Sequence, residues 1–241
     1  MRLSILMPVF NEEATLRKAV DRVLAVEFQE GVEIEFVIVN DGSRDRTREI
    51  LDSLEDPRIR VFHQPRNQGK GAAISRAVQE ATGDYVIICD ADEEYRPSEI
   101  PSLLQPVLDE EAELVYGSRT FGSHTSFSYW YVLGNKGVNL ITNILFNAYI
   151  SDVETCFKLM PLSLYRSLGI REKGFGMEAE VTGKLLARGY RPYEVGISYK
   201  ARTREEGKKI TVKDGFEAIW ILVRIRLREG TRTRPPKTPV S

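Results

Sequence analysis

Short apolar runs alternate with amphipathic segments over the first half of the chain. The runs have the length of buried strands, and each is followed by polar or turn-forming residues. Between them, apolar residues such as Leu16, Val20 and Val23 recur at helical spacing, and Asn11 is expected to cap this first helix at Glu12. The predicted strands cover residues 3–7, 34–39, 59–62, 85–89 and 114–116, and the predicted helices cover residues 12–24, 46–54, 71–81 and 97–107.

Strands that alternate with helices predict an α/β fold, with a mostly parallel sheet flanked by helices on both faces. In such sheets, ligands bind beyond the carboxyl ends of the strands. Polar clusters follow three of the predicted strands at that edge, in residues 8–12, 40–43 and 90–94. We therefore expect the functional site where these three loops meet.

The pattern changes after about residue 120. Residues 129–150 carry apolar residues at helical spacing, which fits a helix packed on the core or one lying on a membrane. A strand at 156–160, a helix at 177–188, a strand at 193–199 and a helix at 214–227 are expected to follow. Residues 1–230 are expected to form one domain, and residues 231–241 a disordered, basic, Pro-containing tail.

Composition and charge narrow the class of protein. Apolar residues make up 42% of the chain, which allows a large core. Residues 200–241 carry 12 basic against 5 acidic side chains, whereas the rest carries 22 against 30. The basic end suits an anionic lipid surface or a phosphate-bearing substrate. Nucleic acid is not an expected partner, because the body is acidic and no recognised binding motif occurs.

Several features concern the cellular location. Two cysteines give no sign of a secreted cystine framework, and Cys89 lies in an apolar run typical of a core. No secretory signal and no membrane-spanning run occur. Trp220 lies among basic residues in the predicted helix at 214–227, which suits an anionic membrane surface. The expected location is the cytoplasm, peripheral on the cytoplasmic face of the membrane.

Asp90 and Asp92 are the main candidates for chemistry. Two carboxylates two residues apart at a strand end repel each other unless a cation lies between them, and their oxygens suit Mg²⁺ or Mn²⁺. The alternative is that one aspartate caps the next helix and the other is solvated. Asp41, followed by Gly42, is either a turn residue or a hydrogen-bond acceptor for a ligand. Dinucleotide, Walker A, nucleophile-elbow and zinc motifs are missing.

Taken together, the motifs resemble the family-2 glycosyltransferases with the GT-A fold over about residues 3–227. The motifs in the first half are Pro8-Val9-Phe10-Asn11-Glu12, Asn40-Asp41-Gly42-Ser43, Asn67-Gln68-Gly69-Lys70-Gly71 and Asp90-Ala91-Asp92. A later set resembles the dolichyl- or polyprenyl-phosphate sugar synthase branch. It comprises Gly117-Ser118-Arg119, Asp152-Val153-Glu154-Thr155-Cys156-Phe157-Lys158 and Phe175-Gly176-Met177-Glu178-Ala179-Glu180. The chain departs from the mannose synthases of this branch at Glu93-Glu94, where they have Leu-Gln, and at Thr155-Cys156-Phe157, where they have Thr-Ser-Gly-Phe.

The resemblance implies a nucleotide-sugar donor, with UDP-glucose and GDP-mannose as the leading candidates. It implies that Mn²⁺ or Mg²⁺ is held by Asp90, Asp92 and Glu94. The residues implied to bind the donor are Pro8, Asn11, Glu12, Asp41, Lys70, Asp90, Ala91 and Asp92.

The implied acceptor is a polyprenyl phosphate, such as dolichyl or undecaprenyl phosphate. Candidates for holding its phosphate are Arg119, Arg202, Lys208 and Lys209, and the catalytic candidates are Asp92, Arg119 and Asp152. An ionised phosphate needs no strong base. A saccharide or protein hydroxyl, acted on by a soluble enzyme, would need one, and Asp152 or Glu154 would then be the first candidates. A regulatory module with a decayed site is a further alternative, which the presence of Asp90, Asp92 and Arg119 disfavours.

Overall fold

The computed structural model describes residues 1–123, 129–201 and 212–230. In this part of the chain, seven strands form one sheet in the order β3-β2-β1-β4-β6-β5-β7. The strands are β1 (Arg2–Val9), β2 (Glu33–Asn40), β3 (Ile59–His63), β4 (Tyr85–Ile88), β5 (Val115–Ser118), β6 (Lys158–Pro161) and β7 (Tyr193–Gly196). Only β6 runs antiparallel to its neighbours β4 and β5, which confirms the prediction of a mostly parallel α/β fold.

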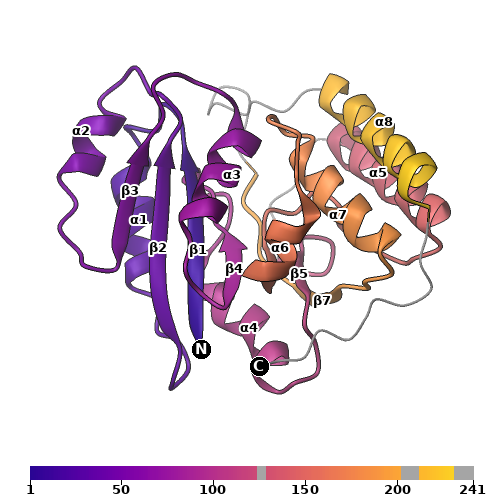
Figure 1. Cartoon of the computed structure of the whole chain (residues 1–241), viewed down its shortest axis with the longest axis horizontal. Coiled ribbons are helices and arrows are strands. Elements are labelled where there is room, and N and C mark those ends of the chain that lie inside the picture. Colours follow the sequence, from indigo (N-terminus) through magenta and orange to yellow (C-terminus); the bar gives the residue numbers. More distant parts are fainter. Residues whose placement is uncertain (124–128, 202–211, 231–241) are drawn as a thin grey trace.

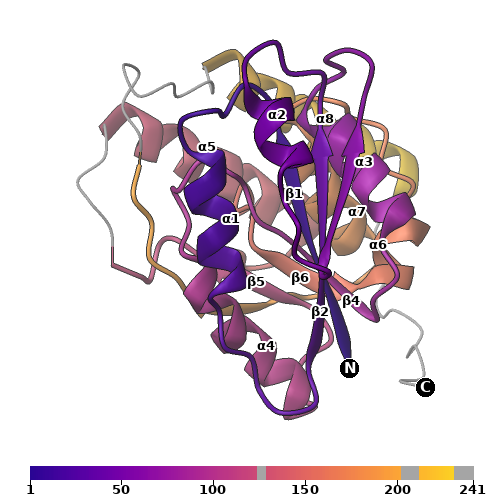
Figure 2. The same ribbon diagram turned by 90° about the vertical axis from the view of Figure 1, so that its left-hand side faces the viewer.

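Helices cover both faces of this sheet (Figures 1 and 2). They are α1 (Leu16–Leu24), α2 (Thr47–Asp52), α3 (Lys70–Glu80), α4 (Ile100–Leu108), α5 (Tyr129–Phe146), α6 (Leu162–Leu168), α7 (Met177–Ala187) and α8 (Val212–Glu229). One core cluster lies between the sheet and the side chains of α3, α5, α6, α7 and α8, and the other lies on the side of α1 and α4. Central strands are buried on both faces, which explains their continuous apolar runs.

The sequence misplaced the start of the first helix. α1 begins at Leu16 rather than at Glu12, and Thr15 occupies the N-cap position. Asn11 instead adopts a left-handed backbone conformation with φ 53°. Its side-chain oxygen accepts a hydrogen bond from the Arg44 backbone at 2.9 Å, and its own backbone N–H donates to Ser43 Oγ at 2.9 Å. Asn11 therefore joins two strand-end loops, because tertiary partners outweigh the local capping preference.

Three further differences concern the second half. Helix α6 follows β6 directly and was not expected from the pattern. β6 begins at Lys158 rather than at residue 156, and β7 ends at Gly196 rather than at residue 199. The predicted tail at 231–241 lies outside the described residues. None of the helices in the described part of the chain has the length and hydrophobicity needed to span a bilayer.

A buried carboxylate fixes the end of the sheet that lies away from the strand-end loops. Glu35 on β2 is 1% exposed. It accepts hydrogen bonds from Ser4 Oγ at 2.5 Å, from Thr82 Oγ1 at 2.9 Å and from the backbone N–H groups of Thr82 and Gly83. Burial alone would raise the pKa of Glu35, but the hydrogen bonds from Ser4 and Thr82 outweigh it and lower the pKa below its ordinary value of 4.5.

Replacing Glu35 by glutamine is expected to lower the free energy of unfolding by about 2–3 kcal/mol at pH 7, since several hydrogen bonds to a charged acceptor are lost. Because the folded-state pKa lies below the unfolded one, the carboxylate stabilises the fold above the unfolded pKa. That stabilisation is lost as pH falls through the folded pKa. Urea unfolding of both proteins at pH 7 and in the acid range checks this, and equal midpoints at pH 7 would contradict it.

Candidate active site

The polar loops after β1, β2 and β4 meet around one cavity of about 270 Å³, because these strands are parallel neighbours and their carboxyl ends share one edge. Pro8, Glu12, Asp41 and Ala91, four of the residues implied to bind the donor, line it. Further wall residues come from later segments, including Arg119, Glu154, Cys156, Phe175, Glu178, Tyr199 and Asp214. Asn11 is not among the lining residues, since it is used to join the loops.

Asp41 organises one wall of the cavity. Its carboxylate accepts hydrogen bonds from the backbone N–H groups of Gln68 and Gly69, both at 2.8 Å, and from Gln64 Nε2 at 2.9 Å. Burial raises the pKa of Asp41, and the two backbone hydrogen bonds oppose that rise. Gly42 follows with φ +68°, and a Cβ there would lie 2.5 Å from the backbone of Arg66. The two interpretations of Asp41, as a turn residue and as a hydrogen-bond acceptor for a ligand, are thus compatible.

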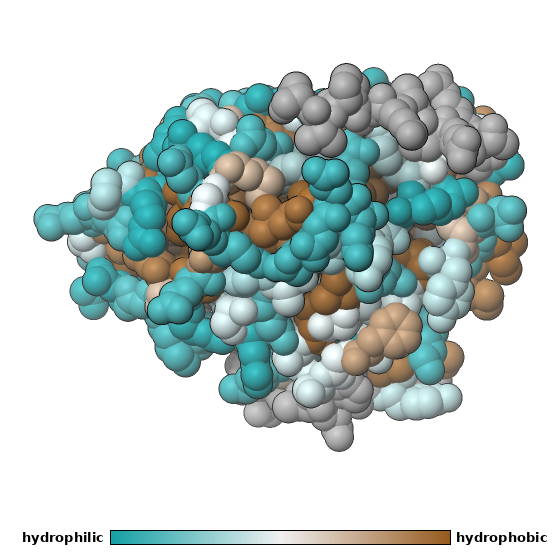
Figure 3. All heavy atoms as spheres, turned by 90° about the horizontal axis from the view of Figure 1, so that it is seen from below, coloured by the Kyte–Doolittle hydropathy of each residue, from teal (hydrophilic) through white to brown (hydrophobic). Residues whose placement is uncertain are grey.

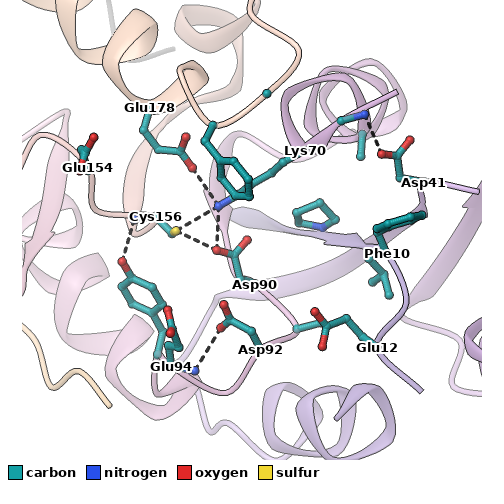
Figure 4. A pocket seen from close by; sticks show the side chains of 18 of the residues that line it. Phe10, Glu12, Asp41, Lys70, Asp90, Asp92, Glu94, Glu154, Cys156 and Glu178 are labelled. Carbon is teal, nitrogen blue, oxygen red and sulfur yellow. Dashed lines mark hydrogen bonds and ion pairs between the residues drawn. The ribbon is translucent and has the colours of Figure 1, made fainter. Parts of the chain in front are cut away.

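Lys70 lies in the middle of the cavity wall and contacts two carboxylates (Figure 4). Its Nζ is 2.7 Å from Asp90 Oδ2 and 2.8 Å from Glu178 Oε1, and Cys156 Sγ lies 3.2 Å away. Burial by itself lowers the pKa of Lys70, but the charges of Asp90, Cys156 and Glu178 outweigh it and raise the pKa well above the ordinary value. Lys70 is the first residue of α3, where a cation is disfavoured by the helix dipole, so these carboxylates hold it there.

The fit of a divalent cation depends on Asp90 and Asp92, which line the same cavity (Figure 4). Asp92 Oδ1 accepts a hydrogen bond from the Glu94 backbone at 3.1 Å. Glu94 Oε2 accepts one from the Tyr199 hydroxyl at 2.7 Å. Within residues 1–123, 129–201 and 212–230, no three acidic, His or Cys side chains converge as a metal-binding group. The three-ligand set of Asp90, Asp92 and Glu94 therefore stays a prediction.

Two carboxylates nevertheless fit Mg²⁺ or Mn²⁺, because such ions usually take one or two protein carboxylates and complete their coordination with water and substrate phosphate oxygens. Asp90 and Asp92 are the residues that could hold the ion. Asp90 Oδ2 is shared with Lys70 and with the Cys156 thiol, whose Sγ lies 2.8 Å away.

Arg119, which lines the cavity, forms a hydrogen-bonded ion pair with Asp152. Arg119 Nε and Nη2 each donate to one oxygen of Asp152 at 2.7 Å, and the Arg119 backbone N–H donates to Oδ2 at 3.0 Å. The guanidinium also lies 5.0 Å from the centroid of the Tyr199 ring. Since both oxygens of Asp152 are engaged, this side chain orients Arg119. Glu154 remains as the half-buried carboxylate of this wall, and burial raises its pKa.

The structure brings together most of the residues predicted to bind the donor, but three predicted acceptor residues, Arg202, Lys208 and Lys209, lie outside the described residues. Sequence reasoning assigned no role to Glu178 or Cys156, although both lie in quoted motifs. Glu178 lies in the first turn of α7, and this acidic residue within a quoted motif was a signal that the sequence offered. That α7 points this turn at Lys70 depends on the tertiary fold.

Fold and site together define a glycosyltransferase domain of the GT-A type. Residues 4–169 match the family model described as "Glycosyl transferase family 2", so the chain belongs to that family, as its motifs predicted.

Relatives of known name extend this similarity. The chain is 26% identical over 237 residues to a dolichol-phosphate mannosyltransferase of Pyrococcus furiosus, covering 95% of this chain and 65% of the relative. It is 40% identical over 106 residues to an undecaprenyl-phosphate 4-deoxy-4-formamido-L-arabinose transferase of Pectobacterium carotovorum, covering 43% and 32%. The chain thus spans less than two thirds of the length of either relative. Both carry names from the branch that the later motifs resemble.

Solved structures share the fold. Glucosyl-3-phosphoglycerate synthase from Mycobacterium tuberculosis in complex with UDP superposes with a TM-score of 0.70 at 20% identity, covering 96% of this chain and 81% of that one. S. aureus TarS in complex with UDP-GlcNAc gives a TM-score of 0.66 at 12% identity, covering 97% and 68%. At these identities the likeness concerns the fold, and it confirms the predicted GT-A architecture.

Replacing Asp41 by alanine is expected to weaken nucleoside diphosphate binding by about 1–3 kcal/mol, because the loop at Gln68 and Gly69 loses its anchor beside the cavity. Isothermal titration measures the change. Asp45→Ala is a matched control, since Asp45 lies in the same loop and accepts backbone hydrogen bonds from Thr47 and Glu13 but does not line the cavity. Unchanged affinity in Asp41→Ala would leave Asp41 as a turn residue alone.

Proposed function

We propose that this chain transfers a hexose from a nucleotide sugar, UDP-glucose or GDP-mannose, to a polyprenyl phosphate at the cytoplasmic face of a membrane. The unit proposed to act is residues 1–230. The observation that carries the proposal is an apolar and basic surface next to the cavity. Helix α8 connects the surface to the cavity. Asp214 on this helix lines the cavity, and Phe216 and Trp220 on the same helix are exposed.

This surface, named the α5–α8 face, is unusual for its composition. Seven of the ten exposed large hydrophobic side chains in the described part of the chain lie on α5 or α8, which pack against each other (Figure 1). They are Tyr129, Leu133, Leu140, Ile144, Phe216, Trp220 and Leu227. Much of the view in Figure 3 is hydrophilic, with hydrophobic residues in its hollows and at the end of the molecule that carries α5 and α8.

The spacing within each helix supports docking to lipid. Leu133, Leu140 and Ile144 share one face of α5, and Phe216, Trp220 and Leu227 share one face of α8. Exposed basic residues lie among them, including Lys136, Lys213 and Arg228. Apolar side chains next to Lys and Arg suit the anionic cytoplasmic leaflet, where a polyprenyl phosphate would present its head group.

The cavity residues support transfer to a phosphate. Arg119, held by Asp152, presents a fixed cation at the wall, and a guanidinium suits phosphate oxygens. Asp41 holds the loop that borders the nucleotide end, and Asp90 and Asp92 would hold Mn²⁺ or Mg²⁺ next to the donor diphosphate. A bound ion supplies Lewis-acid stabilisation of the leaving diphosphate. Lys70 adds positive charge close to the same position.

The acceptor phosphate attacks in its ionised form, so no proton has to be removed by the protein. The competing acceptor, a saccharide or protein hydroxyl, needs a base. Asp152 is engaged with Arg119, so Glu154 would be the candidate for that role.

Purified protein with Mn²⁺ and labelled donor is expected to label undecaprenyl phosphate in anionic vesicles and a short, water-soluble polyprenyl phosphate. Replacing Ile144 and Trp220 together by serine is expected to lower labelling in vesicles by about tenfold or more, because apolar contact with lipid is lost. Labelling of the soluble acceptor should stay unchanged. Radioactivity in an organic extract is the measurement.

The control is Tyr193→Ser, which removes an exposed ring on β7, away from the α5–α8 face. An equal loss in this control would contradict the assignment of the surface. If no donor labels either lipid but a free saccharide is glycosylated, the lipid acceptor is wrong and the hydroxyl acceptor replaces it.

A further inference from the structure

Glu178 has a buried carboxylate oxygen that no described group satisfies. The residue is 5% exposed and lies in the first turn of α7. Its Oε1 is 2.8 Å from Lys70 Nζ, whereas Oε2 is buried and accepts no hydrogen bond within the described residues. A buried acceptor left unpaired destabilises the fold, more so when it is charged, so proteins rarely keep one without use.

The surroundings of Glu178 indicate what kind of partner the free oxygen would take. Glu178 lines the cavity, so a bound molecule can reach it. A second cation on this carboxylate would lie close to the Lys70 ammonium and be repelled by it. A neutral donor meets no such repulsion. A hydroxyl group therefore fits Oε2 better than a metal ion does.

The order of residues along the cavity shows which hydroxyl is available. Figure 4 places Asp41, Phe10 and Glu12 at one end, Asp90 and Asp92 in the middle, and Glu178 with Glu154 at the other end. If the nucleotide lies by Asp41 and the diphosphate by Asp90 and Asp92, the next group of the donor is the hexose. Its hydroxyls would then lie next to Glu178.

We propose that Glu178 accepts a hydrogen bond from a hydroxyl of the transferred hexose and thereby contributes to donor specificity, with Lys70 as the residue that positions it. This inference rests on the proposed nucleotide-sugar donor, but not on the lipid acceptor. Lys70 fixes the carboxylate through Oε1 and leaves Oε2 for the sugar. Because Lys70 also contacts Asp90, the sugar end and the diphosphate end of the cavity share one cation.

The test compares two ligands in the absence of acceptor. Titration calorimetry of UDP and UDP-glucose, and of GDP and GDP-mannose, is carried out with Mn²⁺ on the wild-type protein and on Glu178→Gln. The variant is expected to bind the nucleotide sugar about tenfold more weakly, as for a lost hydrogen bond to a charged group, and the nucleoside diphosphate within about twofold of wild type. A donor deoxygenated at the contacted position should bind the wild type and the variant equally.

Glu180→Gln is the matched control on the same turn of α7. Glu180 is buried but accepts hydrogen bonds from the backbone of Arg171 and Glu172 and does not line the cavity. It should lower thermal stability without changing the ratio of the two affinities. If Glu178→Gln does not fold, Glu178→Asp is measured for the same ratio, and that shorter side chain should also weaken sugar binding selectively.

Equal weakening of nucleoside diphosphate and nucleotide sugar would overturn the inference, because Glu178 would then have a structural role. So would unchanged affinity for both, combined with a rate defect seen only with a hydroxyl acceptor, since that result describes a base. A wild-type protein that binds neither ligand defeats the nucleotide-sugar proposal itself, and this inference with it.

Discussion

Replacing Asp92 by asparagine is expected to lower sugar transfer by about a hundredfold or more and to remove the effect of Mn²⁺ on nucleotide binding. The amide keeps the size of the side chain but loses the charge that a divalent ion requires. Asp92 is a better test than Asp90, because Asp90 also neutralises buried Lys70 at 2.7 Å, and its loss would disturb the whole cluster. The fold of the Asp92 variant should survive, because the asparagine side-chain oxygen can still accept the hydrogen bond from the Glu94 backbone.

Isothermal titration of nucleoside diphosphate, with and without Mn²⁺, measures the binding part of this prediction. Glu93→Gln is the control, because Glu93 is the adjacent carboxylate but pairs with Lys18 and Arg22 away from the cavity. It should behave as wild type. Metal-dependent affinity that persists in Asp92→Asn would defeat the assignment of this residue.

Replacing Arg119 by lysine is expected to lower kcat/KM for polyprenyl phosphate by about a hundredfold, with nucleotide affinity within about twofold of wild type. Lysine keeps the charge but cannot form the two parallel hydrogen bonds to Asp152, so the cation is no longer fixed at the cavity wall. Steady-state kinetics with varied acceptor measures the effect. Loss of nucleotide affinity by a similar factor would show that Arg119 acts on the donor instead.

Asp152→Asn tests the other half of the pair. It leaves the Arg119 guanidinium, 15% exposed, without its counter-charge, so the free energy of unfolding should fall by about 3–5 kcal/mol along with the rate. If Asp152 only orients Arg119, the residual activity keeps the wild-type dependence on pH. If Asp152 is a base, the acidic limb of the rate profile disappears in the variant.

The sequence predicted the order of the elements well in the first half of the chain. There, β1, β2 and β4 contain apolar runs buried on both faces, β3 at the sheet edge is half-buried, and each loop contains turn-forming residues. Local signals and tertiary burial therefore agree. The second half was harder. β6 is short and antiparallel between β4 and β5, and α6 follows it without a loop. Pairing of that kind joins segments far apart in the chain, which a local pattern does not encode.

The sequence by itself determined the family, the α/β fold and the three strand-end clusters, because chain order and strand direction bring those loops to one edge. Only the tertiary structure decided what each side chain does there. Asn11 joins two strand-end loops instead of capping a helix, and Glu94 accepts a hydrogen bond from the Tyr199 hydroxyl. The tertiary structure also placed Lys70 between Asp90 and Glu178, residues 20 and 108 positions further along the chain. Those contacts depend on how helices α3 and α7 pack on the sheet, and packing is a property of the whole chain rather than of any local pattern.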